Sequence, residues 1–151
     1  MTKAKKFNYL NLIKILNRVF VALLIIFMFA RVPIMIEEEK ASKEAEIANN
    51  AMSNIEITLI SKMDRNMGFN FKNNGKIQID GFEALITVKV GSGIEESFGV
   101  THYGKISSNS TSQANYNFYF YESTLRNTSI YDITIEYEIT AVTIDGKRYY
   151  K

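Results

Sequence analysis

One apolar stretch, Val19–Ile36, constrains this chain more than any other feature of its sequence. Seventeen of its eighteen residues are apolar, the exception being Arg31. An α-helix of that length rises ~27 Å, close to the hydrocarbon thickness of a bilayer. We therefore predict a membrane-spanning or membrane-anchoring helix, in which Arg31 extends its guanidinium to the outer headgroups and Pro33 causes a kink.

The charges on either side of this stretch predict its orientation. Residues 1–36 carry six basic side chains and no acidic one, whereas Glu37, Glu38 and Glu39 follow the stretch directly. Because basic residues favour the cytoplasmic side of a span, we expect a cytoplasmic N-terminus and an extracytoplasmic C-terminal domain. The expected localisation is the cell membrane, with a single pass.

A cleaved secretory signal peptide is the alternative, with Val19–Ala30 as its apolar region. A small residue is expected three positions before the cleavage site, but the bulky Met28 occupies that position if cleavage follows Ala30. The apolar run also resumes after Arg31. A retained anchor is therefore the favoured interpretation.

Composition excludes several function classes for the remaining residues. Residues 37–151 carry twelve basic and sixteen acidic side chains, which does not favour binding to nucleic acid. The absence of cysteine excludes disulfides, zinc-thiolate sites and thiol catalysis. His102 is the only histidine and is interpreted as structural. We therefore expect no catalytic, metal or cofactor site, no small-molecule substrate and no enzymatic activity.

A helical pattern continues beyond the membrane. Apolar residues recur at spacings of three and four, at Ala41, Ala45, Ala48, Met52, Ile55, Leu59 and Met63. This stripe predicts an amphipathic helix over residues 37–67, continuous with the anchor from about residue 10 to about residue 64. The alanines Ala41, Ala45 and Ala48 allow close helix–helix contact. The alternative is that they pack on the chain's own domain.

After the helix, the pattern is typical of β-strands. We predict strands over Lys76–Asp80, Phe82–Val90, Ser97–Ile106, Asn115–Tyr121, Ile130–Ile144 and Lys147–Tyr150. Turns are expected at Asp80-Gly81 and Asp145-Gly146, and a change of parity at Ala141–Val142 predicts a bulge. The predicted fold is α+β, with a long helix packed on one small antiparallel sheet. Its four parts are a basic tail (1–18), an anchor (19–36), an amphipathic helix (37–67) and an extracytoplasmic β domain (68–151).

Two tyrosines give the sheet a candidate contact surface. In the predicted strand Asn115–Tyr121, Phe118 and Phe120 lie on one face, and Tyr119 and Tyr121 lie on the other. Aromatic side chains on the face away from the helix are a possible site for a partner. The alternative is ordinary coverage of a sheet edge.

The order of these parts resembles that of type IV pilins and pseudopilins. The resemblance covers Val19–Ile36 with Pro33, the continuation Glu37–Met63 and the sheet of residues 76–150. The segments EAEIANN (44–50) and GKIQIDGFEALITVKV (75–90) are similar to small TadE-like proteins that are encoded with conjugation and secretion genes in Gram-positive bacteria.

Three functions follow as hypotheses. The resemblance implies a pilin-like structural subunit of a conjugation, secretion or surface-filament machine, which associates with itself or with other envelope subunits. The tyrosines favour a membrane-tethered binding module. The third hypothesis is an accessory subunit of a membrane enzyme complex.

Overall fold

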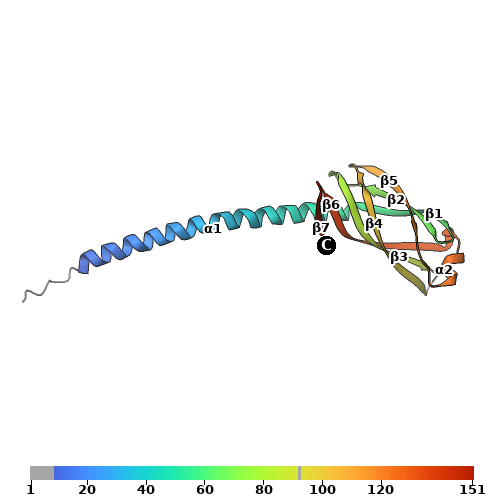
Figure 1. Cartoon of the computed structure of the whole chain (residues 1–151), viewed down its shortest axis with the longest axis horizontal. Helices are drawn as coiled ribbons and strands as arrows, with labels where there is room; N and C mark the ends of the chain where they lie inside the picture. The colour runs from blue at the N-terminus through green and yellow to red at the C-terminus, as the bar shows by residue number, and fades with distance from the viewer. Residues whose placement is uncertain (1–8, 92) are drawn as a thin grey trace, which may run out of the picture. The chain divides into compact units, whose positions relative to one another are not determined.

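The computed structural model describes residues 9–91 and 93–151, so that residues 1–8 of the predicted basic tail lie outside the described part. The described chain divides into two units, residues 9–43 and residues 44–151, and each is described by itself. The elements are α1 (Tyr9–Ser53), β1 (Ile55–Met63), β2 (Asn66–Asn73), β3 (Ile79–Val90), β4 (Ile94–Ile106), β5 (Ser110–Asn117), α2 (Ser123–Asn127), the 3-10 turn η1 (Ile130–Asp132), β6 (Ile133–Ile144) and β7 (Lys147–Tyr150) (Figure 1).

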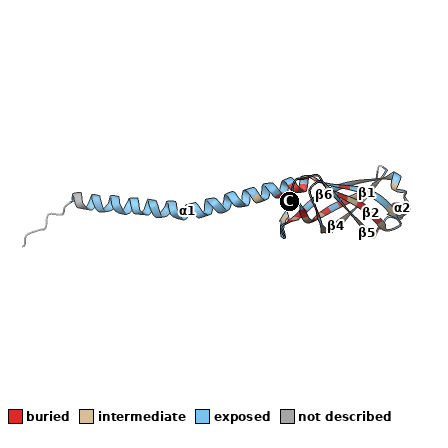
Figure 2. Ribbon diagram, turned by 90° about the horizontal axis from the view of Figure 1, so that it is seen from above, coloured by how far each residue is buried: buried red, intermediate tan, exposed pale blue. Residues whose placement is uncertain are grey.

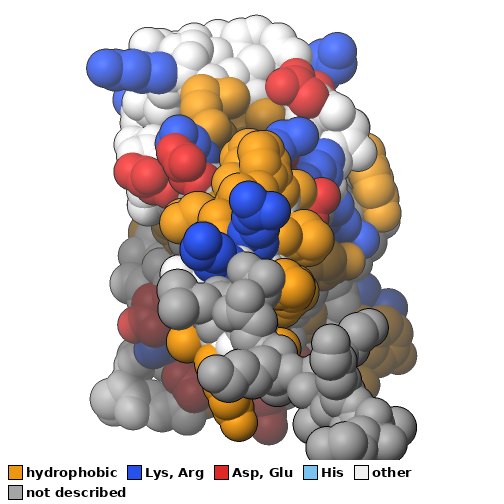
Figure 3. Space-filling view, turned by 90° about the vertical axis from the view of Figure 1, so that its left-hand side faces the viewer, with side chains coloured by type: hydrophobic (Ala, Val, Ile, Leu, Met, Phe, Trp, Pro, Cys, Tyr) orange, Lys and Arg blue, Asp and Glu red, His pale blue; other side chains and the backbone are white. Residues whose placement is uncertain are grey.

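Helix α1 contains the apolar stretch and continues through Pro33. Residues 12–43 are all exposed, and Figure 2 shows this part of the helix in pale blue. In Figure 3, which is seen from the N-terminal side, hydrophobic side chains lie next to basic ones on the surface. The helix is long and apolar enough to cross a membrane and lies near the N-terminus. It is therefore consistent with a membrane anchor.

The helix ends at Ser53, so the prediction that it extends over residues 37–67 is wrong. Asn54 ends it locally, because its side-chain amide donates to the carbonyl oxygen of Asn50 at 2.7 Å. Such a bond satisfies a carbonyl group that the last turn of a helix leaves without a partner. The chain then continues directly into β1.

Strand β1 has the same apolar spacing that predicted a helix. A spacing of four residues is also an even number, so Ile55 and Leu59 share one face of a strand as well as one face of a helix. The burial of Ile57 distinguishes a strand from a helix here. This residue lies between Ile55 and Leu59 and has only 3% of its surface exposed. Alternation of buried and exposed residues, together with the β-branched side chains, favours the strand.

The β domain contains two antiparallel sheets rather than the single sheet that the sequence predicts. One has the order β1-β2-β5 and the other the order β4-β3-β6-β7 (Figure 1). The apolar face of each sheet is covered mainly by the other sheet. The last turns of α1 contribute only Ala48, Ala51 and Met52 to the shared core. The α+β class is confirmed, but within residues 44–151 the two sheets cover each other and only the last turns of α1 pack on them.

Aromatic residues fill the space between the sheets. Phe71 of β2 contacts Phe82 of β3 edge to face, with 5.0 Å between the ring centroids. Phe69 and Phe71 are stacked along β2 at 6.1 Å. Both phenylalanines of β2 are fully buried, as are Met67 beside them and Ile86 of the opposite sheet. These contacts hold the two sheets together without a disulfide, since the sequence has no cysteine.

Two of the predicted irregularities in the sheet are confirmed. Asp145 and Gly146 have positive φ values of 49° and 74° and join β6 to β7 by a two-residue turn. A bulge occurs in β6 close to the predicted position, where Thr140 is the extra residue between Ile139 and Ala141. The predicted turn at Asp80-Gly81 is wrong, because β3 runs through both residues and Gly81 pairs with Thr143 of β6.

Substitutions in β1 test where the helix ends. Ile57→Asp should lower the free energy of unfolding by several kcal/mol, because it buries an unpaired carboxylate in the core. The adjacent Thr58→Asp should change it by about 0.5 kcal/mol or less, since Thr58 is exposed. Thermal unfolding of the full chain in detergent, followed by circular dichroism, measures both. Equal effects would contradict the strand.

Candidate contact surface

The two candidate tyrosines lie in a segment that follows β5. The strand ends at Asn117 rather than at Tyr121, but the predicted alternation continues beyond it. Phe118 and Phe120 are buried, whereas 65% of Tyr119 and 88% of Tyr121 is exposed. The segment thus has an apolar side in the core and a tyrosine side in solvent.

The buried phenylalanines fix this segment to the core. Phe98 of β4 contacts Phe118 and Phe120, with ring centroids 4.6 Å and 5.3 Å away. Phe69 of β2 contacts Phe118 edge to face at 6.0 Å. Because neighbouring residues of an extended segment point to opposite sides, these contacts determine where Tyr119 and Tyr121 point.

Main-chain hydrogen bonds hold the same segment at both ends. The N–H of Phe118 donates to the carbonyl oxygen of Arg65 at 2.8 Å. The N–H groups of Tyr121 and Glu122 donate to the two carboxylate oxygens of Glu96 at 3.1 Å and 2.8 Å. Hydrogen bonds to an ionised carboxylate are among the stronger ones in proteins. The segment is therefore ordered although it belongs to no strand.

Lys62 of β1 fixes the chain beyond this segment. Its ammonium group donates to the carbonyl oxygens of Arg126 at 2.7 Å and Thr128 at 3.1 Å, which lie at the end of α2. It also lies 5.7 Å from the centre of the Phe120 ring. Partial burial lowers the pKa of Lys62. The lysine thus connects β1 to the irregular chain between β5 and β6.

Four side chains form what we call the tyrosine surface, namely the exposed Met63, Tyr119 and Tyr121 and the half-buried Arg65. The two tyrosine rings are tilted against each other with centroids 6.2 Å apart, and the Arg65 guanidinium lies 4.7 Å from the Tyr119 ring centre. Met63 is 80% exposed. A hollow of about 440 Å³ adjoins Met63, Arg65 and Tyr119, and Asn66 and Asn117 also line it. Tyrosine, methionine and arginine are the types enriched at protein–protein interfaces.

The predicted helix–helix residues are in two different environments. Ala41 and Ala45 are exposed, whereas Ala48 is buried to 98% in the core of its own domain. Ala48 follows the alternative interpretation, in which the stripe packs on the chain's own domain. Of these three alanines, only Ala41 and Ala45 are therefore available for contact with a second helix.

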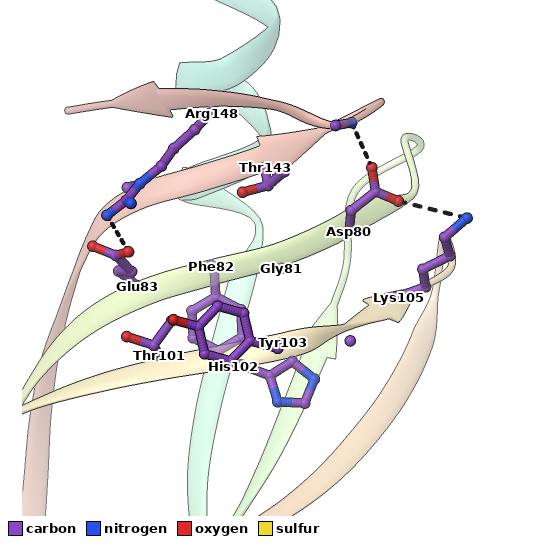
Figure 4. A pocket seen from close by; sticks show the side chains of 13 residues that line it. Asp80, Gly81, Phe82, Glu83, Thr101, His102, Tyr103, Lys105, Thr143 and Arg148 are labelled. Atoms are coloured by element: carbon purple, nitrogen blue, oxygen red, sulfur yellow. Dashed lines mark hydrogen bonds and ion pairs between the residues drawn. The ribbon is translucent and has the colours of Figure 1, made fainter.

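A second hollow, of about 530 Å³, lies over the four-stranded sheet (Figure 4). Both of its acidic groups are paired. Glu83 accepts from Arg148, and Asp80 accepts from the N–H of Gly146 at 2.9 Å and lies 3.9 Å from Lys105. These pairs link β3 to the β6–β7 hairpin and to β4.

His102 also lines this hollow but lies inside the core. Its ring is 4.9 Å from that of Phe71 and 5.5 Å from that of Phe82. Only 8% of it is exposed, and Nε2 has no hydrogen-bond partner. Burial lowers the pKa of His102, which favours the neutral form of its ring. Within residues 9–91 and 93–151, no three His, Asp or Glu side chains are grouped as metal ligands would be.

Comparison of the chain with protein-family models, with curated proteins and with solved structures finds no match.

Sequence reasoning found the two tyrosines but missed the residues that position them. Glu96 was visible only as half of an acidic pair, and Lys62 only as a polar residue of a supposed helix. No pattern in the sequence indicated that Arg65 lies near the tyrosines. The available clue was the alternation of phenylalanine and tyrosine over residues 118–121. It implies that other residues hold this segment with its phenylalanine side toward the core.

The buried histidine predicts a pH dependence of stability. Its pKa is lowered in the fold, so the unfolded chain binds the additional proton as pH falls below its ordinary pKa of about 6.5. Stability should therefore be complete above pH ~7 and decline toward pH 5, by at most ~1.4 kcal/mol per pH unit from this group.

The variant His102→Leu isolates this contribution. It fills the site between Phe71 and Phe82 without a titrating group, so the decline between pH 7 and pH 5 should become shallower than in the parent. Urea unfolding at each pH provides the measurement. An unchanged slope would show that other groups cause the decline.

Proposed function

We propose that this protein is a single-pass, membrane-anchored binding module with no catalytic role. The observation that carries the proposal is the exposure of Tyr119 and Tyr121 on a segment that is held in place from both sides. Interface aromatic residues contribute most when they are rigid before binding, because less conformational freedom is then lost. The partner is a protein of the cell envelope, and the β domain faces it outside the cytoplasm.

The topology in this proposal comes from the charges around the apolar stretch. Lys14 and Arg18 lie before it and Glu37–Glu39 lie after it, which favours a cytoplasmic N-terminus. The apolar stretch of α1 supports the anchor itself, since residues 19–36 are all exposed. The helix then keeps the module at the membrane surface.

A second candidate is a pilin-like structural subunit of a conjugation, secretion or surface-filament machine. It would assemble through its helices, and the exposed Ala41 and Ala45 favour it because small residues allow close helix packing. Because Ala48 is buried, the surface available for this helix–helix contact is shorter than the sequence implies. We therefore rank it below the binding module.

Site-specific photocrosslinking tests the tyrosine surface. A photoreactive phenylalanine analogue at Tyr121 should crosslink to an envelope protein in living cells, and Tyr119→Ala in the same chain should reduce the yield at least several-fold, since interface tyrosines frequently contribute ~2 kcal/mol or more. The matched control is the same analogue at Tyr103, which is 90% exposed on β4 and lies outside the tyrosine surface.

Crosslinks of equal yield from positions 121 and 103 would contradict the proposal. So would a yield at Tyr121 that does not change with Tyr119→Ala. Crosslinks from Ala41 or Ala45 alone would instead favour the pilin-like subunit.

A further inference from the structure

The two sheets have four edge strands, β1, β5, β4 and β7. Exposed edges attract other strands, and proteins protect them with bulges, charges or short length. Strand β1 has an irregularity between Leu59 and Ser61, β4 has one opposite Asp80, and β7 is only four residues long. All three carry charged residues, namely Glu56 and Lys62 on β1, Glu95, Glu96 and Lys105 on β4, and Lys147 and Arg148 on β7.

Strand β5 has none of these protections. Its eight residues, STSQANYN, include no charged residue and no proline. It pairs with β2 in an unbroken register from Ser110 opposite Asn73 to Asn117 opposite Asn66. It is therefore the one regular, uncharged edge among the strands that the structure describes.

The hydrogen-bond pattern identifies which main-chain groups of β5 are available. The N–H of Phe118, just after the strand, donates to Arg65, which precedes β2. In an antiparallel pair, alternate residues bond to the neighbouring strand. The even-numbered residues thus bond to β2. The N–H and C=O groups of Thr111, Gln113, Asn115 and Asn117 point to the free side, and all four residues are exposed.

We propose that β5 pairs with β5 of a second copy of this chain, antiparallel and around a two-fold axis at Ala114. Thr111 then lies opposite Asn117, and Gln113 lies opposite Asn115. Each of these pairs exchanges two main-chain hydrogen bonds, about eight in total. The three-stranded sheets of the two copies become one continuous sheet of six strands.

The absence of charge on β5 favours a second copy of this chain as the partner of its free edge. A two-fold pair brings each strand against itself, and like charges directly opposite each other are destabilising. An uncharged strand of amides and hydroxyls avoids this repulsion, whereas the Lys147–Arg148 edge of β7 would bring basic residues together. Two chains anchored in one membrane also meet at a raised effective concentration. This pairing does not depend on the tyrosine surface.

Proline at position 113 tests the pairing. The N–H of Gln113 points away from β2, so Gln113→Pro leaves the β2–β5 pairing intact while it removes a donor from the free edge. Gln113→Lys is the second variant, since an edge lysine opposes pairing without any backbone change. Its matched control is Thr58→Lys, which adds the same charge to the exposed side of the other edge strand of the sheet.

The full-length chain, purified in detergent, is measured by light scattering during size-exclusion chromatography. The parent and Thr58→Lys should have a protein mass of twice 17.3 kDa, and both Gln113 variants should have half that mass while they keep the circular dichroism spectrum of the folded parent. If Gln113→Pro unfolds the domain, the mass of the Gln113→Lys variant decides whether β5 forms the dimer. A monomeric parent, or a folded Gln113→Lys variant that remains dimeric, overturns the proposal. Crosslinking from Tyr121 in the Gln113→Lys chain reports separately on the tyrosine surface.

Discussion

The folded domain depends on burial of two apolar sheet faces against each other. The chain has no cysteine, so no disulfide restrains it. Fully burying a large apolar side chain contributes roughly 1.5–3 kcal/mol, and Phe69, Phe71, Met67 and Ile86 are all fully buried at this one interface. The edge-to-face contact between Phe71 and Phe82 fixes how the sheets face each other. A sheet without its partner would expose this surface to water.

The same core determines the candidate contact surface. Phe118 and Phe120 extend the aromatic cluster beyond the end of β5, so that Tyr119 between them and Tyr121 after them point outward. Glu96 and Lys62 then hold the irregular chain by its main-chain N–H and carbonyl groups. The exposed tyrosines thus rest on buried phenylalanines. Their position is a consequence of packing rather than of a separate binding loop.

The sequence predicted the parts of the fold that depend on local pattern. The apolar helix, the alternation in β3 and β6, the turn at Asp145-Gly146 and the bulge near Ala141 all follow from spacing and residue type. It failed for β1, where spacings of four residues are compatible with both a helix and a strand. The second sheet was missed for the same reason. With β1 assigned to the helix and no strand predicted over residues 66–73, two of the three strands of that sheet were absent from the prediction.

The candidate site shows a similar division. Alternation alone identified Tyr119 and Tyr121 as exposed. Their neighbours lie at the end of β1 (Met63) and in the turn before β2 (Arg65), and they reach the tyrosines only through tertiary structure, which no local pattern encodes. Ala48 was assigned to a seam because its spacing matched that of Ala41 and Ala45. Whether a small residue faces its own core or another helix depends on where the helix ends.

Protease digestion of right-side-out membrane vesicles tests the central claim, a retained anchor with the β domain outside, most directly. Protease should remove the β domain and leave a membrane-protected fragment that contains the N-terminus and residues 19–36, identified by mass spectrometry. A full-length chain that is protected until detergent is added would contradict the orientation. A mature chain that begins after Ala30 would contradict the anchor.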